Sequence, residues 1–297
     1  MIDDLQAQLG GMFWVIAIGA PVLVLVLVLQ VALKTRLKTK QLKQVFRAGS
    51  IVTDRSAPTT GPLAFGLACG AHMAINQGVA WNDPAGGGFT KLELRMRPAG
   101  MWDVHSATDW QRTMDRLLAE RGEKPADLAV RLRRQAVTAT GVVPDLAGWH
   151  RIIEQAAQTG RIGMRGVPLL TRAAERISRY EDRFRADGIL PPNGVVASLR
   201  AYDWGRAVTM ARWGMRAGYC DRVAAERGVL RAGDLCARHY GSWAELSAGF
   251  GMGRMLSFDD EDFPVHHVEV REAHRKLLAE DASPWRTMPW PAPARAA

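Results

Sequence analysis

The chain has 297 residues, a formal net charge of +9 and three cysteines. That length can bury one substantial hydrophobic core and does not require two domains. An odd number of cysteines without C-x-x-C spacing argues against both a disulfide framework and a zinc knuckle. Reduced thiols are therefore expected at Cys69, Cys220 and Cys236.

The first predicted element is a membrane-spanning helix. A run of 22 residues without a charge extends from Met12 to Leu33. At about 1.5 Å per residue, such a helix is roughly 33 Å long, which is enough to cross a hydrocarbon core of about 30 Å. A secretory signal peptide fits less well, because its cations would precede a shorter apolar run. The sequence therefore predicts a retained anchor at residues 12–33, after a short extracytoplasmic segment at 1–11.

A cluster of cations predicts how this anchor is oriented. Asp3 and Asp4 precede the apolar run without any Lys or Arg, whereas six cations and no anion follow it closely. By the positive-inside rule, the residues after the run face the cytoplasm. This basic collar also suits anionic lipid headgroups. It consists of Lys34, Arg36, Lys38, Lys40, Lys43 and Arg47.

The remaining charge argues against a nucleic-acid partner. Two anions before the anchor and six cations in the collar leave a formal +5 for residues 48–297. In that part cations and anions alternate, as they do on solvated helix faces, instead of forming a basic stripe. Nucleic-acid binding is therefore not expected.

Helical patterns dominate the chain after a collar and polar linker at 34–60. Capping boxes at Ser106 with Asp109 and at Ser242 with Glu245 mark two helix starts. The alternating stretch 89–96 predicts at most one arm of a minor β-hairpin. The expected fold is all-α, with one multi-helix domain at 61–282 and a Pro-rich flexible tail at 283–297. Helices are expected at 62–81, 106–122, 125–138, 145–159, 168–186, 198–218, 233–240 and 266–279, with further helices after Asp221 and Ser242.

Three motifs lie between residues 201 and 254. They read YDWGR from Tyr202, ARWGMRAGY from Ala211, and YGSWAE from Tyr240, which continues to Gly253 and Arg254. These resemble the W-D-x-G-R, A-R-W-G-x-x-A-G-Y and F-x-S-W-x-E segments of the bacterial family called domain of unknown function 1266. A looser likeness covers 101–122, so the family-like core spans 101–256. The resemblance implies a helical bacterial domain and leaves its activity open. The motif aromatics are Trp204, Trp213, Tyr219 and Trp243.

Polar residues of these motifs are the candidate site. Asp203 and Arg206 are spaced i, i+3 on a helix that is apolar on two sides, so they can pair on a central helix. In one interpretation, Glu245 and Arg254 join them in an ion-pair network that locks two helices together. In the other, the cluster is the floor of a cleft. Arg206, Arg212 or Arg254 then meets an anionic ligand, and Asp203 or Glu245 acts as a base.

Two other patterns do not predict a cofactor or metal site. The alternating glycines within 249–253 lack the strand and the Gly-Lys-Ser/Thr ending of a phosphate loop, which favours close helix packing. The histidines within 266–274 lack H-E-x-x-H spacing, which favours a surface cluster over a metal site. No metal and no cofactor is predicted.

Two classes of function agree with the sequence. The first is a membrane-tethered interaction or regulatory protein at the bacterial inner membrane, with a protein partner; an accessory or immunity component of an envelope system is one example. The second is an enzyme or binding protein at the inner face of the membrane that uses the Asp203, Arg206, Glu245 and Arg254 cluster on an anionic small molecule or lipid headgroup. Both an enzyme and a protein without catalytic activity are consistent with the sequence.

Overall fold

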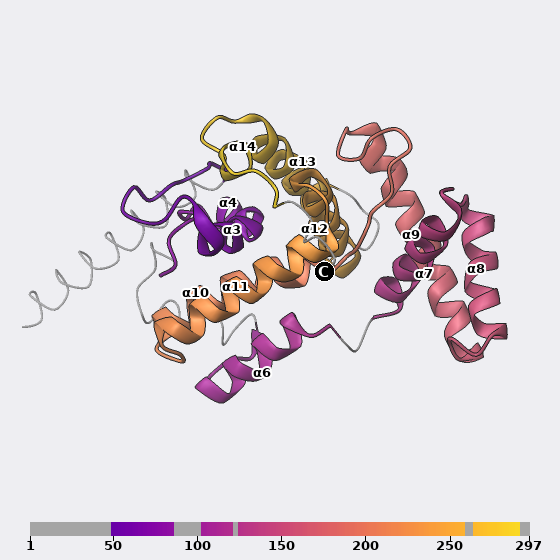
Figure 1. Cartoon of the computed structure of the whole chain (residues 1–297), viewed down its shortest axis with the longest axis horizontal. Coiled ribbons are helices and arrows are strands. Elements are labelled where there is room, and N and C mark those ends of the chain that lie inside the picture. The colour runs from indigo at the N-terminus through magenta and orange to yellow at the C-terminus, as the bar shows by residue number, and fades with distance from the viewer. Residues whose placement is uncertain (1–48, 86–101, 121–123, 259–263, 292–297) are drawn as a thin grey trace, which may run out of the picture. The chain divides into compact units, whose positions relative to one another are not determined.

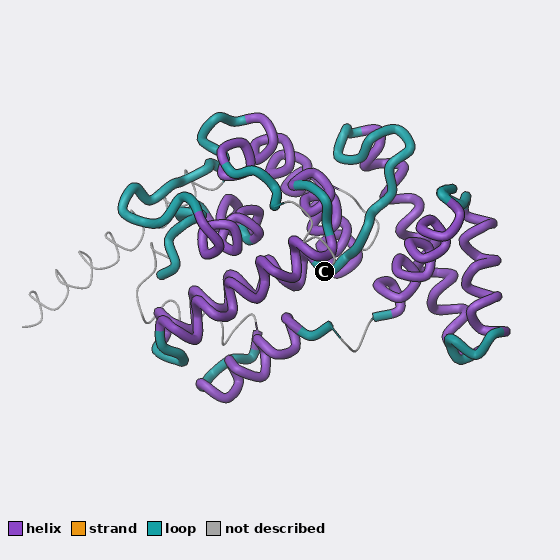
Figure 2. Tube along the Cα trace, in the orientation of Figure 1, coloured by secondary structure: helices purple, strands orange, loops and turns teal. Residues whose placement is uncertain are grey.

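A computed structural model describes residues 49–85, 102–120, 124–258 and 264–291. These ranges consist of helices joined by loops (Figures 1 and 2) and contain one isolated parallel bridge between Val52 and Ala80. The all-α expectation is therefore confirmed for them, while the expected strand at 89–96 lies outside. The helices are α3 (Gly61–Cys69), α4 (Ala71–Gln77), α6 (Ala107–Leu118), α7 (Pro125–Thr140), α8 (Leu146–Gln158), the 3-10 helix η1 (Met164–Gly166), α9 (Val167–Ala186), α10 (Ala201–Ala217), α11 (Arg222–His239), α12 (Trp243–Phe258), α13 (Pro264–Ala279) and α14 (Pro284–Thr287).

The predicted anchor at 12–33 and the six collar cations lie outside the described residues. Among the helices that the structure does describe, none combines the length and the apolar character needed to cross a bilayer.

Two helix boundaries differ from the sequence expectation. The first predicted helix is divided into α3 and α4 at Gly70, whereas two predicted helices after Asp221 form the single helix α11. Gly233 lies inside α11 because α3 passes very close to it: a Cβ there would lie 3.0 Å from the Cα of Gly66. The glycine thus permits a close helix contact and does not end the helix.

The helices enclose two hydrophobic cores that share α12. The first core gathers side chains of α3, α4, α6, α10, α11 and one side of α12. The second gathers side chains of α7, α8, α9 and the other side of α12. Helices α7, α8 and α9 pack against one another (Figure 1). Helix α10 is buried on most sides, with Trp204, Val208 and Ala211 inaccessible to solvent, as its two apolar sides predict.

A glycine of α12 positions the chain that enters α10. A Cβ at Gly249 would lie 2.5 Å from the carbonyl oxygen of Ser198 and 2.5 Å from the hydroxyl of Tyr240. That hydroxyl donates to the Ser198 carbonyl at 2.8 Å and accepts from the Ala201 amide at 3.0 Å. The predicted packing role of this glycine is borne out, and Tyr240 fixes the start of α10.

The expected linker is partly a folded piece of the domain. The Trp81 amide donates to the Val52 carbonyl at 2.9 Å. The buried Asn82 side chain accepts from the Asp54 amide at 2.8 Å and donates back to the Asp54 carbonyl at 2.8 Å. Residues 51–54 are therefore held against the loop after α4.

The expectation of a flexible tail from residue 283 is wrong for residues 283–291. Trp285 is buried, donates from Nε1 to the Ala68 carbonyl at 2.9 Å and stacks on Trp243 with ring centroids 5.2 Å apart. Trp243 donates to the Met288 carbonyl at 2.8 Å, and Trp290 donates to the Tyr240 carbonyl at 3.1 Å. Prolines prevent a long helix here, but the indole groups anchor the segment by burial and hydrogen bonds.

Candidate functional site

Asp203 and Arg206 form the predicted pair. Arg206 donates from Nη1 to Asp203 Oδ1 at 3.1 Å, and Lys124 reaches the other carboxylate oxygen at 3.4 Å. The Arg206 guanidinium also lies 4.2 Å from the centroid of Trp102 and 4.8 Å from that of Tyr202. Both partners of the pair are mostly buried, with side chains 15% and 18% exposed. The arrangement links α10 to the segments before α6 and α7.

The other members of the predicted cluster lie elsewhere. Glu245 is exposed and accepts from the Gly241 amide at 2.7 Å, while its own amide donates to Ser242 Oγ at 3.2 Å. It therefore completes the capping box of α12 instead of joining an ion-pair network. Arg254 forms an ion pair with Glu269 that connects α12 to α13. Neither the four-residue network nor the four-residue cleft floor is formed.

Arg212 has a third, separate environment. It is buried and donates from Nη2 to the Ala80 carbonyl at 2.5 Å, which joins α10 to the loop after α4. Burial lowers the pKa of Arg212 to about 10, although Asp83 opposes the shift. The motif aromatics are mainly packing residues. Trp204, Trp213 and Trp243 are buried, and Tyr219 is half-buried.

Two buried histidines flank one serine in the first core. Ser247 Oγ lies 2.8 Å from His72 Nε2 and 2.8 Å from His274 Nδ1. Because the hydroxyl carries one proton, it donates to one ring and accepts from the other. Ser247 is inaccessible to solvent, and His72 stacks on Phe250. The trio is therefore a structural connection between α4, α12 and α13. His267 is also buried, so the histidines of α13 do not form the expected surface cluster.

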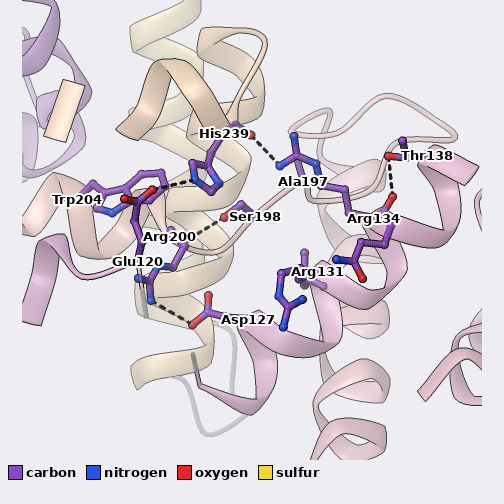
Figure 3. Close-up of a pocket in the computed structure, with 12 residues that line it drawn as sticks. Glu120, Asp127, Arg131, Arg134, Thr138, Ala197, Ser198, Arg200, Trp204 and His239 are labelled. Carbon is purple, nitrogen blue, oxygen red and sulfur yellow. Dashed lines mark hydrogen bonds and ion pairs between the residues drawn. The ribbon is translucent and has the colours of Figure 1, made fainter. Parts of the chain in front are cut away.

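A cleft of about 390 Å³ separates α7 from the start of α10 and the end of α11; we call it the α7–α10 cleft. Asp127, Arg131 and Arg134 project from α7 on one side, and Arg200, Trp204 and His239 lie on the other (Figure 3). Its lining consists of Glu120, Asp127, Val130, Arg131, Arg134, Gln135, Thr138, Ala197, Ser198, Arg200, Trp204 and His239.

Polar contacts connect the two sides of the cleft. Arg200 Nη1 lies 4.0 Å from Asp127 Oδ2, and Arg134 donates from Nη1 to the His239 carbonyl at 3.3 Å (Figure 3). Burial, with Arg134 as the next largest cause, lowers the pKa of His239 and so favours the neutral ring.

Two donors of the cleft lining have no hydrogen-bond acceptor among the described residues. They are Nη2 of Arg200 and Nε1 of Trp204, and both atoms are buried. Leaving a buried donor unmatched costs about 1 to 3 kcal/mol. An acceptor that enters the cleft would recover that free energy. Both atoms can only donate, so the arrangement selects for a ligand rich in acceptors, such as an oxyanion.

Of the residues singled out from the sequence, only Trp204 lines this cleft. Asp203 lines a hollow of about 110 Å³, and Glu245 lines one of about 440 Å³. The missed signal is the run Arg131-Leu-Arg-Arg134 in α7. Arg131 and Arg134 share a helix face, whereas Arg133 points into the second core, where it pairs with Glu181 at 2.6 Å.

The geometry predicts coupling between Asp203 and Arg206. Asp203→Ala removes the carboxylate that both Arg206 and Lys124 contact, and it should lower the unfolding free energy by about 2 kcal/mol. Denaturant unfolding of Asp203→Ala, Arg206→Met and the double variant should give a double-variant loss smaller than the sum of the single losses. The exposed pair Arg222 and Glu226 serves as a control, with expected coupling below about 0.5 kcal/mol. Additive losses for Asp203 and Arg206 would contradict a structural pair.

The histidine pair predicts acid sensitivity. Burial lowers the pKa of His72 well below its ordinary value and lowers that of His274 to about 4. The unfolded chain therefore binds more protons than the folded chain between about pH 6.5 and 4, so stability is full above that window and is lost as the pH falls through it. The loss from His274 should be about 3 kcal/mol.

Unfolding measured across that pH window tests this expectation. His274→Asn keeps a polar group beside Ser247 but cannot titrate there, so its stability should fall less on acidification. The exposed His105→Asn serves as the control and should retain the wild-type slope. A His274→Asn protein with the wild-type slope would refute the assignment.

Comparison with known proteins agrees with the motifs of α10 to α12. Neither a curated protein nor a solved structure matches the chain. Residues 99–290 match the family described as "Protein of unknown function (DUF1266)". That match covers most of the chain, including every helix from α6 to α14 and the whole lining of the α7–α10 cleft. The chain therefore belongs to the DUF1266 family.

Proposed function

We propose that this chain is a membrane-tethered binding protein with a regulatory role, whose helical domain holds an anionic ligand in the α7–α10 cleft. The observation that carries the proposal is the pair of buried donors, Arg200 Nη2 and Trp204 Nε1, that face no acceptor among the described residues. The charge of the lining supports it. The lining contains three arginines, Arg131, Arg134 and Arg200, and two carboxylates, Asp127 and Glu120. Glu120 is itself paired at 2.6 Å with Arg231, which lies outside the lining.

The tether is proposed from the sequence. The uncharged run 12–33 and the cations that follow it support an anchor in the bacterial inner membrane, with the helical domain in the cytoplasm. In that location, a change in ligand occupancy could be passed to a protein partner at the membrane.

An enzyme is the second candidate function. The observation that favours it is the presence of two carboxylates, Asp127 and Glu120, beside the arginines of the cleft. Asp203 and Glu245, two of the four residues expected to act together, line different hollows, so a reaction would have to use the cleft lining instead. Both carboxylates lie within ion-pair distance of arginines, which suits charge balance in a binding site more directly than proton transfer.

The topology can be tested directly. A reporter that is active only in the cytoplasm, fused after Ala297, should be active, because the cation collar keeps the following chain on that side. Replacing the six collar cations by glutamine should reduce the cytoplasmic activity of the reporter. Replacing six arginines of α6 to α11 should leave that activity unchanged. Activity of a periplasm-only reporter at the same position would overturn the proposed topology.

Ligand binding is tested with the full chain in neutral detergent. We expect at least one anion of the carboxylate, phosphate or sulfate classes to raise the melting temperature saturably at constant ionic strength. Arg200→Gln and the exposed Arg134→Gln should each weaken this effect about tenfold, because a hydrogen bond to a charged ligand contributes about 1.5 kcal/mol or more. Arg222→Gln on the outer face of α11 is the matched control. A response that all three variants keep would place binding outside the cleft and refute the proposal.

A further inference from the structure

We infer that the ligand of the α7–α10 cleft carries a phosphate monoester group. This inference rests on the proposed function and adds the chemical class of the ligand. Its first basis is the direction of the donors. Arg131 and Arg134 approach from α7, while Arg200 and Trp204 belong to the opposite wall (Figure 3). A carboxylate offers two oxygens in one plane, whereas a phosphate offers oxygens in several directions and can meet both walls at once.

The charge of the cleft is the second basis. Three guanidinium groups line it against two carboxylates, and one of these, Glu120, is also contacted by Arg231 at 2.6 Å and Arg238 at 3.3 Å from outside the lining. Arg200 is the N-cap residue of α10, a helix of 17 residues, so the partial positive charge of that helix end adds to the arginines. A doubly charged anion is therefore better matched than a singly charged one.

The size and the apolar lining are the third basis. A volume of about 390 Å³ lies within the range of small-molecule sites and exceeds what a phosphate ion alone would fill. The lining also contains the apolar residues Val130, Ala197 and Trp204 next to the arginines. This combination fits an organic group attached to the phosphate. Two sources share that chemistry, namely a soluble phosphomonoester and a lipid with a phosphomonoester headgroup.

Matched probes separate phosphate from other oxyanions. The full chain in neutral detergent is titrated with phenyl phosphate, benzenesulfonate and benzoate at constant ionic strength, with heat of binding as the readout. These probes share one ring and differ in the shape and charge of the anionic group. We expect phenyl phosphate to bind about tenfold more tightly than either of the others, since charge-assisted hydrogen bonds to arginine favour it. Equal or tighter binding of benzoate would overturn the phosphate assignment and leave anion binding in the cleft intact. Binding of none of the three would overturn both.

Variants place the phosphate between the two walls. Trp204→Phe removes the Nε1 donor and keeps an aromatic ring, and Arg134→Gln changes an exposed side chain of the opposite wall. Each variant should weaken the binding of phenyl phosphate about tenfold. The binding of benzoate should weaken less, because the two oxygens of benzoate do not reach both walls. Arg222→Gln should leave both affinities unchanged. If Trp204→Phe does not fold, Arg134→Gln alone tests the inference. An equal loss of affinity for both probes in the Arg134→Gln protein would contradict it.

Competition distinguishes the two sources. Nanodiscs that contain phosphatidate present a phosphomonoester, whereas those with phosphatidylglycerol present a phosphodiester of similar surface charge. Displacement of phenyl phosphate by phosphatidate alone supports the inference with a lipid ligand. Displacement by neither lipid supports it with a soluble phosphomonoester. Equal displacement by both would show attraction to a charged surface and would contradict recognition of a phosphomonoester.

Discussion

Helix α12 is the element on which the rest of the domain depends, because it is buried on opposite sides by two different cores. Leu246 and Phe250 pack in the first core, and Ala248, Met252 and Met255 pack in the second. Burial of a Leu, Phe or Met side chain contributes about 1.5 to 3 kcal/mol. A helix that is apolar all round cannot be stable at a surface, so α10 and α9 must enclose it. The α7–α10 cleft lies between α7, a helix of the second core, and α10 and α11, two helices of the first core.

The close packing of α12 also determines the geometry of the cleft. Gly249 allows the Ser198 carbonyl and the Tyr240 ring to approach the helix, and the Tyr240 hydroxyl then holds both Ser198 and the start of α10. Arg200 lies between these two fixed points, and Trp204 follows it by one helical turn. A glycine of α12 and the hydroxyl of Tyr240, which follows α11, therefore position the two donors that we assign to binding. Trp290 extends the same arrangement by holding the Tyr240 backbone from the C-terminal segment.

Local signals in the sequence are enough to predict most helices but not how their side chains combine. The Ser106 and Ser242 capping boxes and the two apolar sides of α10 are short-range patterns, and each appears in the structure. Glu245 illustrates the limit. Its spacing from Ser242 already predicts a cap, and in the structure its carboxylate makes that local contact at the helix start, away from the Asp203 and Arg206 pair. The sequence does not show the packing of the C-terminal segment for a related reason. Proline content indicates a backbone preference and does not reveal that Trp285 is buried.

The sequence does not reveal the cleft, because one run of arginines contains both a buried, paired arginine and an exposed one. Arg133 is buried, donates to both oxygens of Glu181 at 2.6 and 2.9 Å, and lies 3.8 Å from the centroid of Trp149. Its donors are directed at acceptors within the domain, so it stabilises the second core and has little left to offer a ligand. Arg134, one residue later, is exposed and makes a single long hydrogen bond to a carbonyl. Removing a partner from Arg133 would leave a buried charge, whereas moving Arg134 costs one weak contact. The difference between them is the helical phase, about 100° per residue, and the position of neighbouring helices. Composition cannot show this difference, and it decides which arginine holds the fold together and which can meet an anion.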